Sequence, residues 1–450
     1  MLGQPSTHSP LAASAAAAQP SRCYAWLVFA LSFGLLLSDY MSRQVLNAVF
    51  PLLKVEWSLT DTELGVLGGI VALMVGLLTF PLSILADRWG RVRSLVLMAA
   101  LWSLATLGCA LADNFGQMFV ARLCVGIGEA AYGSVGIAVV LSVFPRHLRA
   151  SLSSAFIAGG AFGSVLGMAL GGTLSAHFGW RWAFAGMAVF GLALVAVYRV
   201  VVTEARLRAQ RRLLGETAPD VAPDVAPGAA PRERVALRAL LPALFSARSI
   251  LCAYAGSALQ LLVMGALLTW MPSYLSRYYG MATDVAGVTA AAFVLAGGAG
   301  MILCGALTDW VSRVVPQRKW LMAVAYSVTC CALLLAAFRL PPGTAQLVLI
   351  GAGMLFVGGT AGPASAAVAN LTHPSIHATA FATLTLANNL LGLAPGPFVT
   401  GVIADHVGLL GALQVVPMAG VPAALCFLAG RRYYTADLRR LEGRRETCAH

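Results

Sequence analysis

The sequence predicts an all-α membrane protein with twelve transmembrane helices, arranged as two six-helix halves with pseudo-symmetry. Three observations lead to this fold class: the composition, the spacing of long apolar runs, and a charged motif that occurs once in each half. Of the 450 residues, 59% are hydrophobic and only 11% are charged. Soluble domains contain roughly 25% charged residues, so the composition excludes a soluble protein.

Twelve apolar runs are long enough to cross a bilayer, for which a helix needs about 20 residues. Helices are required because lipid offers no hydrogen-bond partners to an open backbone. The expected spans are roughly 24–52, 63–85, 94–112, 115–143, 152–175, 183–202, 250–274, 286–308, 320–340, 345–371, 378–404 and 410–430.

These spans group into an N-terminal half, 24–202, and a C-terminal half, 250–430. We expect a disordered tail at 1–23, a linker at 203–249 and a second tail at 431–450, all cytoplasmic. The linker contains the Pro-rich run APDVAPDVAP, Ala218–Pro227, which cannot pack as a core. We therefore expect little fixed structure in the linker.

The positions of the basic residues set the orientation. Most of the 30 Lys and Arg residues lie in the tails, in the linker and in the turns on one side of the spans. The loops on the other side contain only Lys54, Arg181, Arg277 and Arg339. The basic side is normally cytoplasmic, so we expect both termini inside. The arginine- and alanine-rich usage indicates a bacterial protein, for which we expect a place in the inner membrane. The net charge of +12 is thus explained by topology and does not indicate a nucleic-acid partner.

A charged turn occurs in both halves. The segment SILADRWGR, Ser83–Arg91, returns in altered form as GALTDWVSR, Gly305–Arg313, and each copy lies between two long apolar runs. A duplicated helical bundle has a cleft between its halves, and the halves can rock about it. This arrangement indicates movement of a solute across the membrane.

The first copy of the turn resembles a motif of the major facilitator superfamily, G-x-x-x-D-[R/K]-x-G-[R/K]-[R/K], with Ser83 at the first Gly position. The resemblance covers about residues 24–430. It implies that the turns form a cytoplasmic gate, with gating residues Asp87, Arg88, Arg91, Asp309 and Arg313. The alternative is that these charges only anchor the protein at the membrane surface. The second copy has Trp310 and Ser312 where the motif has Arg and Gly. We therefore expect it to hold the cytoplasmic gate closed more weakly than the first copy.

A finer resemblance is to the Spinster-like branch of that superfamily. The segment ARLCVGIGEAAY, Ala121–Tyr132, is similar to the pattern R-x-x-x-G-I-G-E-A-x-Y of the branch, and the related anion:cation symporters share the Arg–Glu spacing. Both branches tend to have N-Y-x-D-R in the first span. This chain has DYMSR, Asp39–Arg43, so Ser42 occupies the usual position of the Asp.

Four ionisable residues lie deep in the spans: Asp39, Arg43, Arg122 and Glu129. Such residues cost several kcal/mol in lipid and normally face a cavity or a partner. Asp39 and Arg43 are four residues apart and share a helix face. Arg122 and Glu129 are two turns apart, about 10 Å along the axis. If the first and fourth spans face each other, each acid has an Arg within reach.

The functional interpretation of this cluster is a proton-coupled anion site. Glu129 and Asp39 would carry the proton, because burial favours the uncharged form of a carboxyl group. Arg122 and Arg43 would bind the substrate, since guanidinium groups clamp carboxylates and phosphates. The alternative is a structural salt bridge. Tyr40, Tyr132, Gln260 and Asn388 are further candidates for substrate contacts, with ordinary packing or interhelical hydrogen bonds as their alternative.

The sequence thus predicts a monomeric secondary transporter, driven by protons as a symporter or antiporter. Its expected partners are the bilayer and a small organic anion or an anionic amphiphile; the resemblance to Spinster alone suggests a lysophospholipid. The sequence has no enzyme motif, and its nine Cys and seven His residues show no metal-ligand spacing. We therefore expect no enzymatic activity, no cofactor and no metal. The alternatives are a proton-driven exporter of hydrophobic drugs and a non-transporting membrane sensor.

Overall fold

The computed structural model describes residues 22–145, 148–213, 245, 247–313, 315, 317–372 and 377–449. The predicted N-terminal tail lies outside these residues except for its last two positions. Most of the predicted linker, including the Pro-rich run, lies outside them as well. Every element in the described part of the chain is helical.

The N-terminal half contains six membrane-spanning segments, as the sequence predicts. The fourth of these is divided into two helices. The helices are α1 (Arg22–Trp57), α2 (Asp61–Trp89), α3 (Arg91–Ala110), α4 (Phe115–Glu129) with α5 (Tyr132–Leu141), α6 (Arg149–Phe178) and α7 (Trp180–Val201).

The C-terminal half repeats this plan, again with an interrupted fourth segment. Its helices are α10 (Arg248–Tyr279), α11 (Thr283–Ser312), α12 (Arg318–Ala337), α13 (Thr344–Val357) with α14 (Ala361–Leu371), α15 (His377–Asn388), α16 (Pro395–Val415) and α17 (Gly420–Ala449). A π-helical turn, η3 (Asn389–Leu393), joins α15 to α16, and a 3-10 turn, η4 (Val416–Ala419), precedes α17.

The last two spans are continuous in helical content but not in direction. Residues Thr379–Arg440 form one apolar helical stretch of 62 residues. A straight helix of that length would measure about 93 Å, far more than a bilayer. The chain instead turns at Gly408, whose φ of 78° is non-helical, and α17 runs back beside α10 and α12. The eleven candidate spans therefore contain twelve crossings.

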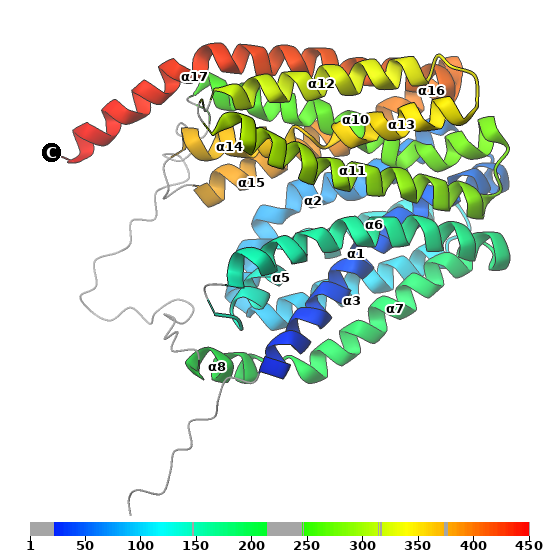
Figure 1. The fold of residues 1–450 in the computed structure, drawn as a ribbon. Coiled ribbons are helices and arrows are strands. Elements are labelled where there is room, and N and C mark those ends of the chain that lie inside the picture. The colour runs from blue at the N-terminus through cyan, green and yellow to red at the C-terminus, as the bar shows by residue number, and fades with distance from the viewer. Residues whose placement is uncertain are drawn as a thin grey trace, which may run out of the picture.

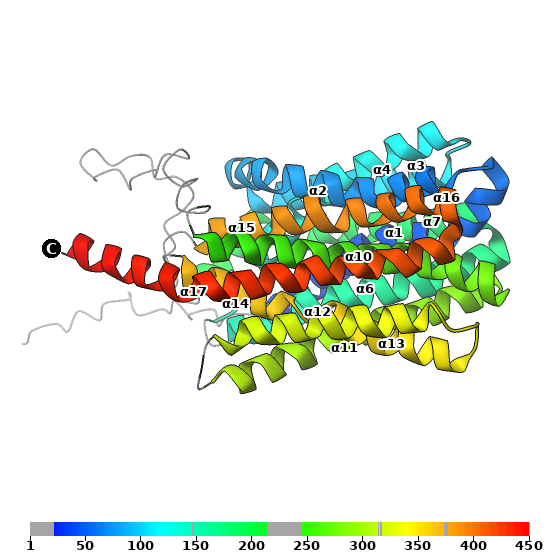
Figure 2. The ribbon, with the colours of Figure 1, turned by 90° about the horizontal axis from the view of Figure 1, so that it is seen from above.

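The helices lie roughly parallel in two bundles (Figures 1 and 2). The beginning of α1 and the end of α17 lie at the same end of the bundle, which we call the inner end; the opposite end is the outer end. Across the interface between the halves, α2 packs against α16 and α6 packs against α11. Large apolar side chains such as Leu97 and Ile302 are exposed on the bundle, as a lipid-facing surface requires.

Two predicted extramembrane segments contain helix, which differs from the prediction only for the linker. The linker begins with a short helix, α8 (Glu204–Leu213), so the expectation of little fixed structure fails for these residues. Glu204 explains the difference in part, because its Oε1 accepts a hydrogen bond from the Val92 backbone N–H at 2.9 Å, at the start of α3. At the other end of the chain, α17 continues through the predicted tail as far as Ala449.

Candidate functional site

A charged cluster lies in the N-terminal half, where α1 meets the end of α4. Asp39 and Arg43 lie one helical turn apart on α1, and the Arg43 Nε lies 3.2 Å from Asp39 Oδ1. The same Nε lies 2.7 Å from Glu129 Oε2 of α4. The hydroxyl of Ser42 donates to Glu129 Oε1 at 3.2 Å. One guanidinium therefore bridges two carboxylates from different helices.

Accessibility differs among the members of the cluster. The side chains of Asp39 and Glu129 are 3% and 0% exposed, whereas that of Arg43 is 20% exposed. The Tyr40 ring lies beneath the Arg43 guanidinium, 5.0 Å from it. Arg43 is thus the most accessible of the three charged side chains that form the bridge.

Each acid has an arginine within reach, as expected, but the same Arg43 serves both, and no ion pair between Arg122 and Glu129 occurs among the described residues. The Arg122 Nη1 donates to the Ser42 carbonyl at 2.9 Å, and the Arg122 Nη2 lies 3.5 Å from the Arg43 carbonyl. The physical reason is the spacing: two turns of α4 place Arg122 about 10 Å away from Glu129 along the axis. Arg122 is 2% exposed, so it clamps the backbone of α1 from inside the bundle.

The helix break in the fourth span occurs at this cluster. α4 ends at Glu129 and α5 starts at Tyr132, and the hydroxyl of Thr79 on α2 shares its proton between the carbonyl of Ala130 at 2.7 Å and that of Val75 in its own helix at 2.5 Å. The bond to Ala130 satisfies a carbonyl that the break removes from the helix ladder. Interrupted helices near the midplane are a common way to build solute sites in transporters. The sequence analysis missed this break; the glycines at 126, 128 and 133 were its only signal.

The two predicted tyrosines have different surroundings. Tyr40 is half-buried and contacts Arg43, as described above. Tyr132 is fully buried inside the N-terminal half, where its hydroxyl donates to the Ser32 carbonyl at 2.7 Å and its ring meets Trp102 edge to face. These contacts favour ordinary packing for Tyr132, the alternative to a substrate contact.

In the C-terminal half, Gln260 is fully buried on α10 beside the thiol of Cys330 on α12. It therefore lies within its own half. Asn388 is half-buried at the end of α15, and its buried Oδ1 has no hydrogen-bond partner among the described residues. Asn388 precedes the π-helical turn, in the interrupted eleventh span that α2 packs against.

The predicted gating residues lie at the inner end of the bundle. Arg88 is exposed at the end of α2, and Arg91 is the first residue of α3 after Gly90, whose φ is 98°. Asp309 and Arg313 are exposed at the end of α11. The side chain of Asp87 lies outside the described part of the structure.

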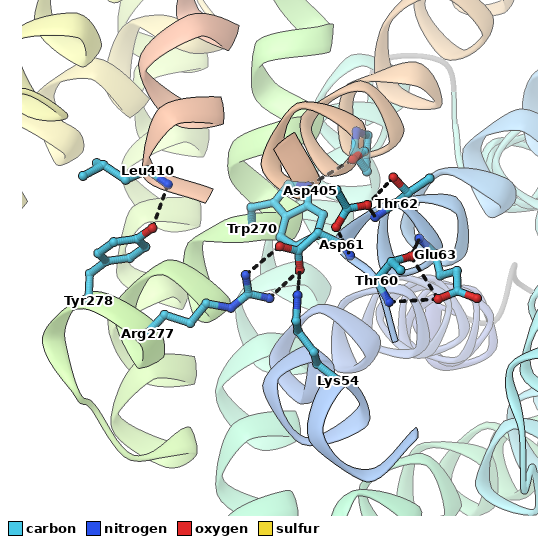
Figure 3. Close-up of polar contacts among 11 residues, drawn as sticks. Lys54, Thr60, Asp61, Thr62, Glu63, Trp270, Arg277, Tyr278, Asp405 and Leu410 are labelled. Atoms are coloured by element: carbon cyan, nitrogen blue, oxygen red, sulfur yellow. Dashed lines mark hydrogen bonds and ion pairs between the residues drawn. The ribbon is translucent and has the colours of Figure 1, made fainter. Parts of the chain in front are cut away.

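At the outer end, polar contacts join the halves (Figure 3). Arg277 of α10 makes a bidentate pair with Asp61 at the start of α2, with distances of 2.9 and 2.7 Å, and Lys54 lies 2.6 Å from the same carboxylate. Asp405 of α16 accepts hydrogen bonds from the backbone N–H groups of Asp61 and Thr62 at 2.8 and 2.9 Å. We call these five residues the outer contact cluster. From the sequence, its four charged members were loop and helix-end residues to which no partner could be assigned.

Closer to the charged cluster, apolar contacts continue this closure. The rings of Phe50 and Trp270 lie 5.6 Å apart across the interface, and the Asn47 side-chain amide is 3.4 Å from the Leu268 carbonyl. Asn47 is one turn outward from Arg43. The side of Arg43 that faces the outer end is therefore covered by contacts between the halves.

Comparison with known proteins places these features in context. The family model of the Major Facilitator Superfamily matches residues 32–397. The uncharacterized MFS-type transporter EfpA of Mycobacterium tuberculosis is 31% identical over 41% of this chain, which covers only 35% of that relative. The gallate transporter of Pseudomonas putida is 27% identical, over 76% of this chain and 77% of the relative.

Two further similarities concern Spinster proteins. The probable sphingolipid transporter spinster homolog 2 of Arabidopsis thaliana is 26% identical, over 78% of this chain and 72% of the relative. The crystal structure of a bacterial homologue of the human lysosomal transporter Spinster, in an inward-facing and unoccupied conformation, matches with a TM-score of 0.79. It is 20% identical and covers 93% of this chain and 99% of that chain, so this match supports the fold.

Proposed function

Because this chain belongs to the Major Facilitator Superfamily of membrane transporters, we propose that it moves a small organic anion across the membrane in exchange or together with protons. The observation that carries the proposal is the bridge formed by Arg43 between Asp39 and Glu129. The proposal also includes a cytoplasmic position for both termini and the bacterial inner membrane as the location.

The bridge supplies a coupling mechanism. While both carboxylates are ionised, the Arg43 guanidinium is paired with two negative charges. It therefore binds a third negative charge, that of a substrate, only weakly. When a proton neutralises Glu129, one of the two charges that hold the guanidinium disappears, and Arg43 can bind the carboxylate or phosphate of a substrate. Loss of that proton restores the bridge and releases the anion. Proton and substrate thus control the same cation.

Arg43 also explains the preference for an anion. It is the partly exposed member of the cluster, and a planar guanidinium recognises carboxylate and phosphate through two parallel hydrogen bonds. The aromatic ring of Tyr40 next to it offers a surface for the apolar part of such a solute. Gallate is an aromatic carboxylate, and the relative named as its transporter supports this class.

An anionic amphiphile such as a lysophospholipid is the second substrate class. The Arabidopsis relative named as a probable sphingolipid transporter supports it. Both classes share an anionic group for Arg43 and differ in the apolar part. Uptake of short aromatic acids and of lysolipids therefore separates them in one experiment.

The test uses purified protein in liposomes, with a panel of organic acids and lysolipids and with or without an acid gradient. Wild type is compared with Glu129→Gln, which keeps the shape of the side chain and removes its charge. Glu63→Gln is the matched control, because Glu63 is a half-buried acid that caps α2 outside the charged cluster. Gradient-driven uptake that disappears only in Glu129→Gln supports the proposal. Uptake of neutral drugs that is unaffected by Arg43→Gln would contradict it.

A further inference from the structure

The first helical turn of α2 has an incomplete set of caps within its own half. Thr60 and Glu63 form a capping box, in which the Thr60 hydroxyl accepts from the Glu63 N–H and the Glu63 carboxylate accepts from the Thr60 N–H. The N–H groups of Asp61 and Thr62 remain, and both donate to the carboxylate of Asp405 in the other half. The C-terminal half therefore completes the cap of a helix in the N-terminal half.

We infer that Asp405, Asp61 and Arg277 form the outer gate, a lock between the halves that holds the outer side closed and has to break before the outer side opens. Asp405 binds the α2 N-terminus, where a negative charge is favoured. Arg277 binds the Asp61 side chain with both terminal nitrogens. The C-terminal half supplies the acceptor in the first contact and the donor in the second. Both contacts cross the interface, so separation of the halves breaks both.

The charges of the outer contact cluster, which includes Lys54, are balanced within each half. Lys54 and Asp61 belong to the N-terminal half and stay paired at 2.6 Å when the halves separate. Arg277 and Asp405 belong to the C-terminal half and have opposite charges. Opening therefore exposes no net charge on either half, which keeps the open state accessible. A lock of this kind can switch between two arrangements, as alternating access requires.

Close backbone contact allows the short Asp405 side chain to reach its donors. Gly401 lies one turn before Asp405 on α16, and a Cβ atom at Gly401 would overlap the Asp61 carbonyl oxygen. A Cβ atom at Gly65 of α2 would likewise lie only 2.5 Å from the Pro397 carbonyl oxygen. The two helices thus approach closely because glycines face the partner backbone at both positions.

The experiment measures how often the outer side opens in the absence of substrate and of a proton gradient, so its outcome does not depend on the proposed function. The reporter is Thr269→Cys in a chain whose nine native cysteines have been replaced. Thr269 is 4% exposed, and its methyl group faces Gly68 across the interface. A membrane-impermeant thiol reagent added from outside should react with this cysteine only when the gate opens.

We expect Arg277→Gln and Asp405→Ala each to raise the labelling rate roughly tenfold, within the usual range for conformational coupling. Asp405→Asn should give a smaller increase, because Asn also caps helix N-termini. Glu56→Gln is the matched control: this outer acid pairs with Trp180 and Arg181 within its own half, so the labelling rate should stay unchanged. Since Arg277→Gln and Asp405→Asn change few atoms, they remain informative if Asp405→Ala fails to fold. Labelling at the parental rate in both would overturn the inference.

Discussion

At the scale of single residues, Arg43 has the most demanding role. Its Nε lies within ion-pair distance of two carboxylates, and its side chain is the exposed one of the cluster. A residue in this position has to be a permanent cation with several donors, which describes arginine and not lysine. The role of Arg43 therefore depends on the geometry of its side chain in addition to its charge.

Replacement of Arg43 by Lys tests this point. We expect Arg43→Lys to lower the rate of uptake at least about tenfold, because a point charge loses at least one charge-assisted hydrogen bond worth about 1.5–3 kcal/mol. Uptake assays in liposomes measure the effect. Lys319→Arg at the inner end is the control for Arg–Lys exchange elsewhere. A rate equal to wild type in Arg43→Lys would show that charge alone is sufficient.

Glu129→Gln should separate net transport from exchange. The substituted side chain cannot release a proton, so we expect accumulation driven by an acid gradient to disappear. Exchange of labelled for unlabelled substrate across the membrane should persist, because it requires no change of protonation. Both are measured in the same liposome preparation. Loss of exchange together with accumulation would indicate that Glu129 serves folding or substrate binding.

Arg122 should act on stability. It donates to the Ser42 carbonyl from a buried position, 2% exposed. We expect Arg122→Met to reduce the free energy of unfolding by about 2 kcal/mol. Thermal unfolding in detergent gives the measurement, with the exposed Arg93→Met as control. Equal stability of the two variants would contradict the clamp.

At the scale of elements, the break between α4 and α5 depends on a neighbour. Thr79 of α2 supplies the hydroxyl that binds the freed Ala130 carbonyl. Thr79→Val keeps the shape and removes the donor, so we expect a loss of about 1–3 kcal/mol in stability, together with slower uptake. Thr79→Ser retains the hydroxyl and should behave like wild type. Unfolding curves and uptake rates of the pair decide the matter.

The elements also show what the sequence could and could not reveal. Span number and the four buried charges were predictable, because apolar length and charges in lipid are local properties of the chain. The pairing of Arg43 with both acids was not, since it depends on how α1 and α4 rotate against each other. The contact of Asp405 with α2 was equally hidden, because residues 61 and 405 are far apart in the sequence.

At the scale of the whole molecule, close contact between the halves rests on small residues. A Cβ atom at Gly172 of α6 would lie 2.7 Å from the Thr283 carbonyl oxygen and 3.0 Å from the Cα of Gly287 on α11. We therefore expect Gly172→Ala to push the outer ends apart. Spin labels at Asp113→Cys and Leu340→Cys, both exposed, should report a longer distance between the halves.

The matched control is Gly186→Ala. A Cβ atom there would meet only Leu174 of the same half, at an ordinary contact distance of 3.7 Å. The spin-label distances should then equal those of the parent. If Gly172→Ala also gave the parental distances, the α6–α11 contact would not limit how closely the halves approach.

The π-helical turn Asn389–Leu393 has a consequence for the eleventh span. A π turn holds one extra residue compared with an α-helix, and one residue corresponds to about 100° of rotation. The side chains before the turn, such as Asn388, are therefore out of phase with those after it, such as Pro397. Deleting one residue within the turn would bring both segments into a single phase. With Pro397 still packed toward α2, Asn388 would then point in a different direction from its present one. The single inserted residue therefore lets one span present two separate faces to its surroundings.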